Sequence, residues 1–488
     1  MKILFASSEA VPLIKTGGLG DVSGSLPPAL HSLGHDVRLI LPAYADAVAR
    51  ISDIEPLGTL EVAGAPSRVR LLGGLLADST VPVYLVEAPG LFDRPGNPYV
   101  DLDGRDWWDN PLRFAVFDRA VVEVALGHSA LGWRPDVVHT NDWQTGLVSP
   151  LLADYAERPA TLFTIHNMAY QGSFDRAIFD SLGLPAHWWS VEGLEFYGKF
   201  SFLKGGIAKS DVISTVSPTY AREIRQPHLG YGLQGVLNHR ADRLYGILNG
   251  IDYHLWDPAA DPMIPQRFSA EEFHLKRRNK TRLQQAFGLE ECPDGMLFGH
   301  IGRLVEQKGI DLILAVLPEL MAQPDTQLAI LGAGDKRLEA AAREASERYP
   351  GRVGCRIAYD EALSHLVEAG SDCFLMPSRF EPCGLNQLFS LRYGTVPIVH
   401  RTGGLADTVI DAGPAQVADG TATGFVFDEP TPAGLWWAVG RAIEYWRRPG
   451  VWWERLAVTG MRHDYSWAAS ARRYEELYEV ARGLAAPG

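Results

Sequence analysis

The sequence predicts an α/β protein with two doubly wound domains, whose parallel sheets face a central cleft. Short apolar runs bounded by turn residues recur along the chain, as buried parallel strands do. Segments with helical periodicity fill the gaps, and this alternation indicates parallel sheets with right-handed crossovers. The 488 residues are enough for two or three domains, since a domain takes roughly 100–200 residues.

The expected strands form two series. The first comprises residues 3–6, 37–41, 137–139, 162–165 and 212–216. The second comprises residues 296–301, 327–331, 353–357, 373–376 and 396–399. Helical periodicity between strands is clearest at 309–320 and 336–349. Ligands of such sheets bind at the carboxyl ends of the strands.

A hinge is expected near Tyr245, where the two series separate. Asn249-Gly250 is a turn signal, and several prolines follow before the next expected strand. We therefore expect domains at 1–244 and 245–465. Residues 466–488 are expected to form an amphipathic helical tail, which could pack back on the first domain or on the second.

Composition excludes several classes of protein. Hydrophobic content of 46% and charged content of 21% are ordinary for a soluble globular protein. A net charge of −14 argues against nucleic acid as a partner, because phosphate backbones need a basic face. There is no apolar run of about 18 residues to span a membrane. Four cysteines without zinc or CxxC spacing indicate reduced thiols and a cytoplasmic location.

A glycine turn, Lys15-Thr16-Gly17-Gly18-Leu19, follows the first expected strand and precedes a helix expected at 22–32. Two glycines allow close backbone approach, and the first helical turn favours an anion. Lys15 adds a positive charge. A generic tight turn is the alternative, since the segment matches neither GxGxxG nor a Walker A loop. The segment is echoed in the second half at 402–409.

Two cations follow the strand expected at 296–301. Arg303 offers a planar fork and Lys308 a point charge, which together suit the two phosphates of a nucleotide sugar. A surface salt-bridge pair is the alternative.

Glu381 follows another expected strand and immediately precedes Pro382, a favoured first helical residue. We therefore expect its carboxylate at a helix N-terminus, ionised and able to accept hydrogen bonds from sugar hydroxyls. A plain helix cap is the alternative. Cys383 is expected to be a packed small residue rather than a nucleophile.

Taken together, these motifs resemble bacterial glycogen synthases and plant starch synthases over nearly the whole chain. The segments that carry the resemblance are Ser7–Glu9, Val11–Val22, His139–Gln144, Thr164–Asn167, Leu248–Asp252, Gly302–Leu304, Gln307–Gly309, Pro377–Leu385 and Arg401–Val409. Separate Arg, Lys and Glu pieces recur across GT-B glycosyltransferases, whereas the KTGGLGDV opening is much more specific.

The resemblance implies a GT-B fold of two Rossmann-like domains, with the acceptor on the first and the sugar-nucleotide donor on the second. It implies a retaining transfer of glucose from ADP-glucose to the non-reducing 4-hydroxyl of an α-1,4-glucan such as glycogen. No metal or other cofactor is expected. Front-face attack is implied in preference to a covalent adduct on Asp142, although spacing does not decide between them.

The resemblance also implies roles for individual residues. The implied catalytic residues are Lys15, Asp21, Asp142, His166, Arg303, Lys308 and Glu381. The implied donor-binding residues are Lys15, Gly17, Gly18, His166, Asn249, Arg303, Lys308, Tyr359, Glu381, Cys383, Gly384, Leu385, Thr402, Gly403 and Gly404. Tyr359 is expected to stack on adenine, and Asp142 to lie near the reacting carbon. Asn386 departs from the family pattern, which usually has Thr.

Three other functions are weighed. A sucrose- or trehalose-type transferase of the same fold is disfavoured by the TGGLGD opening. A non-catalytic glucan scaffold would be expected to lose Lys15, Arg303, Lys308 or Glu381. A nicotinamide dehydrogenase would need more than Gly332 and Gly334 of its fingerprint. Paired tryptophans are more often packing than sugar platforms, and Trp107-Trp108 is the pair we expect to contact the acceptor.

Overall fold

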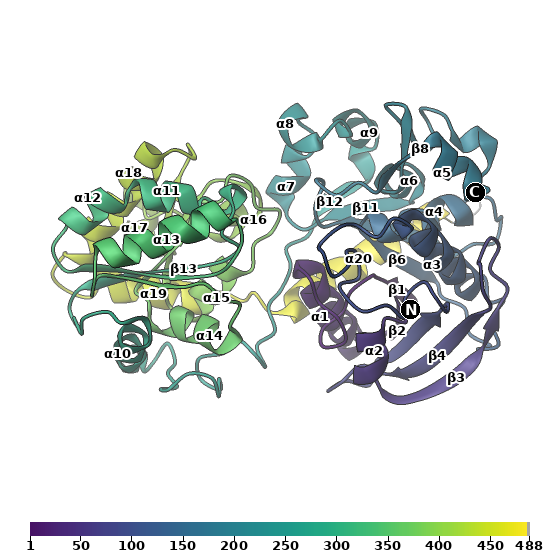
Figure 1. Ribbon diagram of the computed structural model, residues 1–488. Helices are drawn as coiled ribbons and strands as arrows, with labels where there is room; N and C mark the ends of the chain where they lie inside the picture. Colours follow the sequence, from purple (N-terminus) through teal and green to yellow (C-terminus); the bar gives the residue numbers. More distant parts are fainter. Residues whose placement is uncertain (486–488) are drawn as a thin grey trace. The chain divides into compact units, whose positions relative to one another are not determined.

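The computed structural model describes residues 1–485, which form two compact units (Figure 1). The first unit comprises Met1–Gly250 together with the helix α20 (Trp467–Ala485), and the second comprises Ile251–Ser466. The chain therefore passes between the units after Gly250, a few residues beyond the expected hinge at Tyr245. The tail is a part of the first unit.

The first unit is built on a nine-stranded sheet with the order β12-β11-β7-β6-β1-β2-β5-β4-β3. Its strands are β1 (Lys2–Ala6), β2 (Asp36–Pro42), β3 (Ser52–Leu60), β4 (Val69–Leu75), β5 (Pro82–Glu87), β6 (Val137–Asn141), β7 (Ala160–Ile165), β11 (Val212–Thr215) and β12 (Leu244–Gly246). The strands from β12 to β5 pair in parallel. This arrangement was predicted for β1, β2, β6, β7 and β11, whereas β5 and β12 are additional to the predicted strands.

One edge of this largely parallel sheet is antiparallel. β4 pairs antiparallel with both β5 and β3. Unlike β5, the strands β3 and β4 lack the continuous apolar runs that mark the buried strands. β3 is largely exposed, and β4 alternates buried with more exposed residues, as expected where one sheet face meets water.

Helices surround this sheet. They are α1 (Gly18–Ser32), α2 (Ala45–Arg50), α3 (Asn110–Ala125), α4 (Val148–Leu152), α5 (Arg176–Ser181), α6 (Phe202–Lys209), α7 (Pro218–Glu223), α8 (Pro227–Gly230) and α9 (Gln234–His239). A small antiparallel sheet joins β8 (Ser173–Asp175), β10 (Lys199–Ser201) and β9 (Glu195–Phe196). Helix α1 begins at Gly18, earlier than predicted, so the glycine pair stands at the helix start.

The tail helix α20 packs against α1 and β7 and completes the core of the first unit. Tyr478 and Tyr474 are fully buried on it. The Tyr478 hydroxyl and His139 Nδ1 are 2.8 Å apart, and His139 Nε2 lies 2.7 Å from Thr164 Oγ1. Burial lowers the pKa of His139 well below its usual range. His139 is therefore a neutral core residue that joins the tail to the sheet.

The second unit contains a six-stranded parallel sheet with the order β15-β14-β13-β16-β17-β18. Its strands are β13 (Met296–Ile301), β14 (Thr326–Leu331), β15 (Val353–Arg356), β16 (Cys373–Met376), β17 (Val396–His400) and β18 (Phe425–Phe427). All five predicted strands of the second series are present.

Helices cover both faces of the second sheet. They are α10 (Lys276–Phe287), α11 (Ile310–Ala315), α12 (Leu317–Ala322), α13 (Lys336–Arg348), α14 (Glu361–Gly370), α15 (Asn386–Arg392), α16 (Gly403–Thr408), α17 (Pro414–Asp419), α18 (Pro432–Trp446) and α19 (Trp452–Met461). Figure 1 shows α11 and α13 on one face and α10 and α14 on the other. The helix predicted at 309–320 is broken at Val316, because Pro318 has no N–H to donate to the Leu314 carbonyl and its ring crowds that carbonyl.

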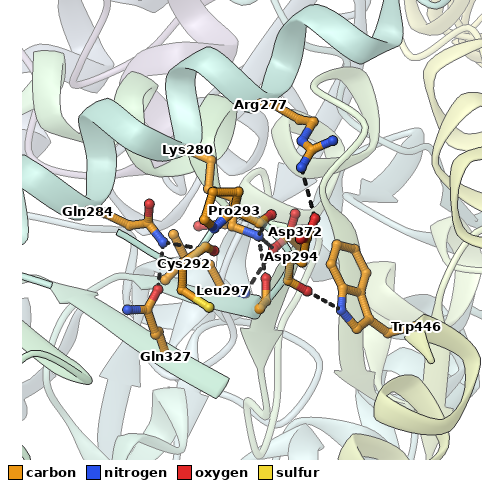
Figure 2. Close-up of polar contacts among 12 residues, drawn as sticks. Arg277, Lys280, Gln284, Cys292, Pro293, Asp294, Leu297, Gln327, Asp372 and Trp446 are labelled. Carbon is orange, nitrogen blue, oxygen red and sulfur yellow. Dashed lines mark hydrogen bonds and ion pairs between the residues drawn. The ribbon is translucent and has the colours of Figure 1, made fainter. Parts of the chain in front are cut away.

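A buried ion pair links α10 to the amino ends of β13 and β16 in the second sheet (Figure 2). Lys280 points from α10 to Asp372, with Nζ 2.7 Å from the carboxylate, and both side chains are largely buried. Asp372 in turn accepts a hydrogen bond from the Leu297 amide at 2.8 Å. Lys280 also donates to the carbonyls of Pro293 and Gly295. The cluster therefore ties α10 to the beginnings of β13 and β16, at the end of the sheet away from Arg303 and Lys308.

Candidate active site

The Lys15–Gly18 loop of the first unit is fixed by a buried carboxylate, Glu9. Glu9 is 3% exposed. Its Oε2 accepts hydrogen bonds from the amides of Thr16, at 2.5 Å, and Gly17, at 3.1 Å. Its Oε1 accepts from Thr16 Oγ1 at 2.6 Å and from the Tyr99 hydroxyl at 2.5 Å. Glu9 is a residue for which the sequence reasoning gave no role, although its position just before the loop was a signal.

The glycine pair in this loop is not required by internal packing. A Cβ added at Gly17 or Gly18 would meet no atom of the described residues within 4 Å, and Gly17 has extended backbone that any residue can adopt. The open space favours close approach by a ligand over a generic tight turn. Lys15 Nζ lies 2.7 Å from Asp21 Oδ1, and both side chains are partly exposed. The structure thus brings Lys15 and Asp21 together.

Asp142 follows the end of β6 and is held in a strained backbone conformation. Its φ is 57° and its ψ −179°, a region that costs a non-glycine residue about 1–3 kcal/mol. The Oδ1 atom accepts hydrogen bonds from the amides of His166, at 2.7 Å, and Asn167, at 3.4 Å. Burial raises the pKa of Asp142 to about 7, and the charge of Glu9 acts in the same direction. Strain and a raised pKa are typical of functional carboxylates.

His166 follows the end of β7 and lies beside Asp142. Its Nε2 is 2.9 Å from the side-chain oxygen of Asn141, whose amide nitrogen donates to the Ala6 carbonyl. With that amide orientation, the His166 proton sits on Nε2 and Nδ1 is left as an acceptor. Burial lowers the pKa of His166 to about 3, so the imidazole is neutral.

After His166, Asn249 is a second side chain of the first unit with an unused hydrogen-bond acceptor. Its side chain is 7% exposed, and its Oδ1 has no hydrogen-bond partner in the described part of the chain. A buried acceptor without a partner is costly, so it marks a place where a hydroxyl group would bind.

In the second unit, Lys308 and Glu381 form an ion pair, with Nζ 2.6 Å from Oε2. Lys308 ends a short 3₁₀ helix after β13, and Glu381 lies in the loop after β16. Ser378 Oγ donates to the same carboxylate at 3.0 Å. Arg303 is exposed, and its guanidinium donates to Gln307 Oε1 at 3.1 Å. A carboxylate and a lysine ammonium group therefore lie side by side at the carboxyl ends of the strands.

The prediction that Glu381 sits at a helix N-terminus is wrong. Helix α15 begins at Asn386, and the preceding residues form a loop. Gly384 has a φ of 74°, and this left-handed residue interrupts the helical path after Pro382. The Glu381 carboxylate is instead held by Lys308 and Ser378. Asn386 donates its side-chain amide to the Ile301 carbonyl at 2.8 Å, so the departure from the family pattern has a local hydrogen-bonding role.

The glycines of the second loop differ from those of the first. A Cβ at Gly403 would lie 1.9 Å from the Glu381 carbonyl oxygen, and one at Gly404 would lie 2.0 Å from that of Cys383. The Gly404 amide lies 3.2 Å from the carbonyl oxygens of both Glu381 and Pro382. These glycines therefore let α16 approach the Glu381 loop. Of the other predicted residues, Thr402 and Cys383 are buried, while Gly384 and Leu385 are half-buried.

The predicted aromatic contacts differ in exposure. Tyr359 is 85% exposed, between β15 and α14, so its ring is open to stacking. Trp107 is half-buried, with its indole nitrogen 3.2 Å from the Asn97 carbonyl and the Arg94 guanidinium 5.0 Å from its ring. Trp108 is 83% exposed. Of the two tryptophans that are predicted to contact the acceptor, Trp108 is therefore the one with the more accessible side chain.

In residues 1–485, no group of three or more His, Cys, Asp or Glu side chains is arranged to hold a metal ion. Over the same range, no helix is both long enough and apolar enough to cross a membrane.

Comparison with known proteins decides the family. Residues 2–239 match the family model of the starch synthase catalytic domain, and residues 284–449 match that of glycosyl transferases group 1. A glycogen synthase of Thioalkalivibrio sulfidiphilus is 54% identical over 481 residues, which cover 98% of this chain and 99% of that protein. The chain belongs to the glycogen and starch synthase family. Glycogen synthase 1 of Methylococcus capsulatus is 52% identical, with 99% of this chain and 97% of that protein covered.

Solved structures confirm the GT-B fold of this family member. The catalytic domain of starch synthase IV from Arabidopsis thaliana, bound to ADP and acarbose, has a TM-score of 0.88 and 34% identity, covering 99% of each chain. A sucrose-phosphate synthase from Thermosynechococcus elongatus is 18% identical with a TM-score of 0.60 over 98% of each chain, and shares the fold. The chain is thus a glycosyltransferase of the glycogen synthase type, not a dehydrogenase or a scaffold.

Proposed function

We propose that this enzyme transfers glucose from ADP-glucose to the non-reducing 4-hydroxyl of an α-1,4-glucan such as glycogen, with retention of the anomeric configuration. The observation that carries the proposal is the Lys308–Glu381 pair, with the left-handed Gly384 after Glu381 in the loop and the exposed Arg303 shortly before Lys308 in the sequence. Cations suit a diphosphate, and a carboxylate suits sugar hydroxyls. The relatives' names support a glucan product, and the ADP bound in starch synthase IV supports the nucleotide.

In this proposal the second unit holds the donor. Arg303 and Lys308 bind the diphosphate, with the loop Thr402–Gly404 against it. Glu381 and the backbone from Cys383 to Leu385 hold the glucose hydroxyls. Tyr359 stacks on the adenine.

The first unit supplies residues for the same sugar. Lys15 and the Gly17-Gly18 turn approach the phosphates and the glucose, and Asp21 orients Lys15. His166 Nδ1 and Asn249 Oδ1 are acceptors for glucose hydroxyls. Asp142 lies near the reacting carbon. The strained backbone and the raised pKa of Asp142 support this role.

The difficult step is cleavage of the bond between the glucose C1 and the phosphate oxygen. Positive charge develops on the sugar and negative charge on the leaving diphosphate. Arg303 and Lys308 stabilise the leaving group, and losing one such donor costs about 3–4 kcal/mol. Because these cations neutralise the charge, the proposed reaction uses no metal. The acceptor attacks from the same face, and the leaving phosphate takes its proton.

Four free cysteines are consistent with the cytoplasm as the location.

The test is release of nucleoside diphosphate from ADP-glucose and UDP-glucose, each with and without glycogen. We expect glycogen-dependent release that is faster with ADP-glucose. Lys15→Ala and Glu381→Ala should each lower kcat at least about a hundredfold. Lys336→Ala is the matched control, because its side chain is 89% exposed and pairs with Glu339 on the same helix, α13. Release with neither donor would overturn the activity, and full kcat in Glu381→Ala would overturn the site. A glucosyl adduct trapped on Asp142 would overturn front-face attack.

A further inference from the structure

Three exposed tyrosines lie on loops of the first unit, and these loops contact one another. Tyr170 is 57% exposed, Tyr197 80% and Tyr231 41%. The side-chain amide of Gln171 donates to the Tyr231 carbonyl at 3.0 Å. A Cβ placed on Gly232 would lie 3.2 Å from the Tyr197 ring. The loops that carry the three tyrosines therefore form one continuous surface.

Two of these tyrosines occupy backbone positions that disfavour them. Tyr197 has a φ of 50° and, with Gly198, makes the two-residue turn between β9 and β10. Asn-Gly is the preferred pair in such turns. Tyr231 has a φ of 47° at the end of α8, where glycine is the usual residue. Both side chains are exposed, so burial in the core does not offset the energetic cost of their left-handed backbone conformation. Strain of this kind collects at binding sites.

We propose that Tyr170, Tyr197 and Tyr231 (the tyrosine platform) bind glucose units of the α-1,4-glucan that lie beyond the unit accepting the new glucose. The inference rests on the proposed function, which supplies a polymeric acceptor. A tyrosine ring offers a flat apolar face to the C–H face of a sugar, and its hydroxyl bonds to sugar hydroxyls. Tyrosine also gives large contact area at low cost in conformational entropy.

Two observations favour a glucan over other occupants. The first is continuity with the candidate active site. Tyr170 is four residues from His166 in the sequence, and its amide donates to the Asn167 carbonyl at 3.3 Å, which closes the turn between them. The second is charge. Lys199, next to the Tyr197 turn, lies 3.7 Å from Asp175, so opposite charges are adjacent there. An uncharged polysaccharide suits such a surface.

The test compares the double variant Tyr170→Ala/Tyr197→Asn with the wild type. Asn is chosen at 197 because it tolerates the left-handed backbone. Tyr155→Ala is the matched control, since Tyr155 is 44% exposed on the same unit. Glycogen affinity is measured by retardation in native gels, and KM is measured for glycogen and for maltotriose. We expect about a five- to tenfold weaker glycogen affinity and a similar rise in KM for glycogen. The kcat and the KM for ADP-glucose should not change. The KM for maltotriose, which has only two glucose units beyond the accepting one, should rise less than the KM for glycogen.

The outcomes separate this proposal from the proposed function, because gel retardation needs no turnover. Unchanged retardation and KM for glycogen in the double variant would overturn the platform while transfer by the wild type stood. Loss of retardation by the variant would support the platform even if ADP-glucose were not a donor. The variant Tyr170→Phe/Tyr197→Phe keeps the rings but loses their hydroxyls, so it should bind glycogen more tightly than Tyr170→Ala/Tyr197→Asn and more weakly than the wild type. A wild-type dimer that the double variant loses, with unchanged retardation, would show a self-association surface and overturn the proposal.

Discussion

The Glu9 carboxylate accepts hydrogen bonds from two amides and two hydroxyls, and three of these donors belong to Thr16 and Gly17. These four donors provide the compensation that a buried carboxylate needs. The backbone that carries Lys15 is therefore positioned by a residue that need not touch the substrate.

We predict that Glu9→Ala lowers kcat/KM for glucosyl transfer by about a hundredfold, because misplacing a site by about 1 Å costs this much. Glu9→Gln should have a smaller effect, since the hydroxyls of Thr16 and Tyr99 can turn and accept from the new amide. Steady-state kinetics with ADP-glucose and glycogen measure both. Equal, wild-type rates in the two variants would show that the loop does not depend on Glu9.

The buried Asp142 carboxyl should make the stability of the enzyme depend on pH. The pKa of Asp142 is raised from 3.8 to about 7 by burial, so the folded state binds the proton more tightly than the unfolded state. Stability from this group is therefore present below about pH 4 and is lost as pH rises to about 7, by of order 4 kcal/mol. Asp142→Asn keeps an acceptor for the His166 amide and removes the titration. The Tm advantage of Asp142→Asn over wild type should grow from pH 4.5 to 7.5, and a constant difference would contradict the raised pKa.

At the scale of the element, the Lys280–Asp372 pair separates stability from activity. Lys280→Ala leaves the Asp372 carboxylate largely buried without its cation, which costs about 3–5 kcal/mol. Arg277→Ala, on the same helix, removes an exposed pair with Asp294 and should change the free energy of unfolding by less than about 1 kcal/mol. Thermal unfolding measures the contrast, while KM for ADP-glucose should stay unchanged in both. A Tm for Lys280→Ala as high as that of Arg277→Ala would refute the account.

The elements that the sequence predicts best are the buried parallel strands, because continuous apolar runs between turns leave few alternatives. β13 and β16 match their predicted ranges. The antiparallel edge strand β3 escaped prediction, since its exposed residues carry no apolar run. Glu381 shows a different limit. Pro382 is compatible with a helix start, but a glycine two residues later takes a left-handed conformation, which residue type alone does not decide.

The candidate site was predictable where chemistry depends on residue type. Cations, carboxylates and glycine turns could be named from the sequence, and the structure places Lys15 with Asp21, Asp142 with His166, and Lys308 with Glu381. What could not be predicted is long-range pairing. The Glu9 bond to Tyr99 spans 90 residues, and no local pattern signals it. The sequence also does not show that Gly17 and Gly18 border open space, whereas Gly403 and Gly404 allow a close approach of two backbone segments.

At the scale of the whole molecule, the chain order predicts unequal independence of the two units. Residues 251–466 are continuous and should fold when expressed alone. Residues 1–250 lack α20, which buries Tyr474 and Tyr478 in the first core, and should not fold stably. Linking 467–488 to that fragment through a flexible spacer should restore it. Circular dichroism and thermal unfolding of the three fragments provide the test, and a cooperative transition in 1–250 alone would contradict the prediction.

We propose that residues of both units serve one retaining transfer from ADP-glucose. This proposal is tested most directly by following ADP-[1-¹³C]glucose and maltotriose by NMR, with wild type, Lys15→Ala and Lys308→Ala. We predict that the wild type forms a new α-1,4-linked glucose carrying the label, and that each variant, one from each unit, loses this product at least about a hundredfold. A β-linked product, free labelled glucose as the main product, or wild-type rates in either variant would contradict the claim.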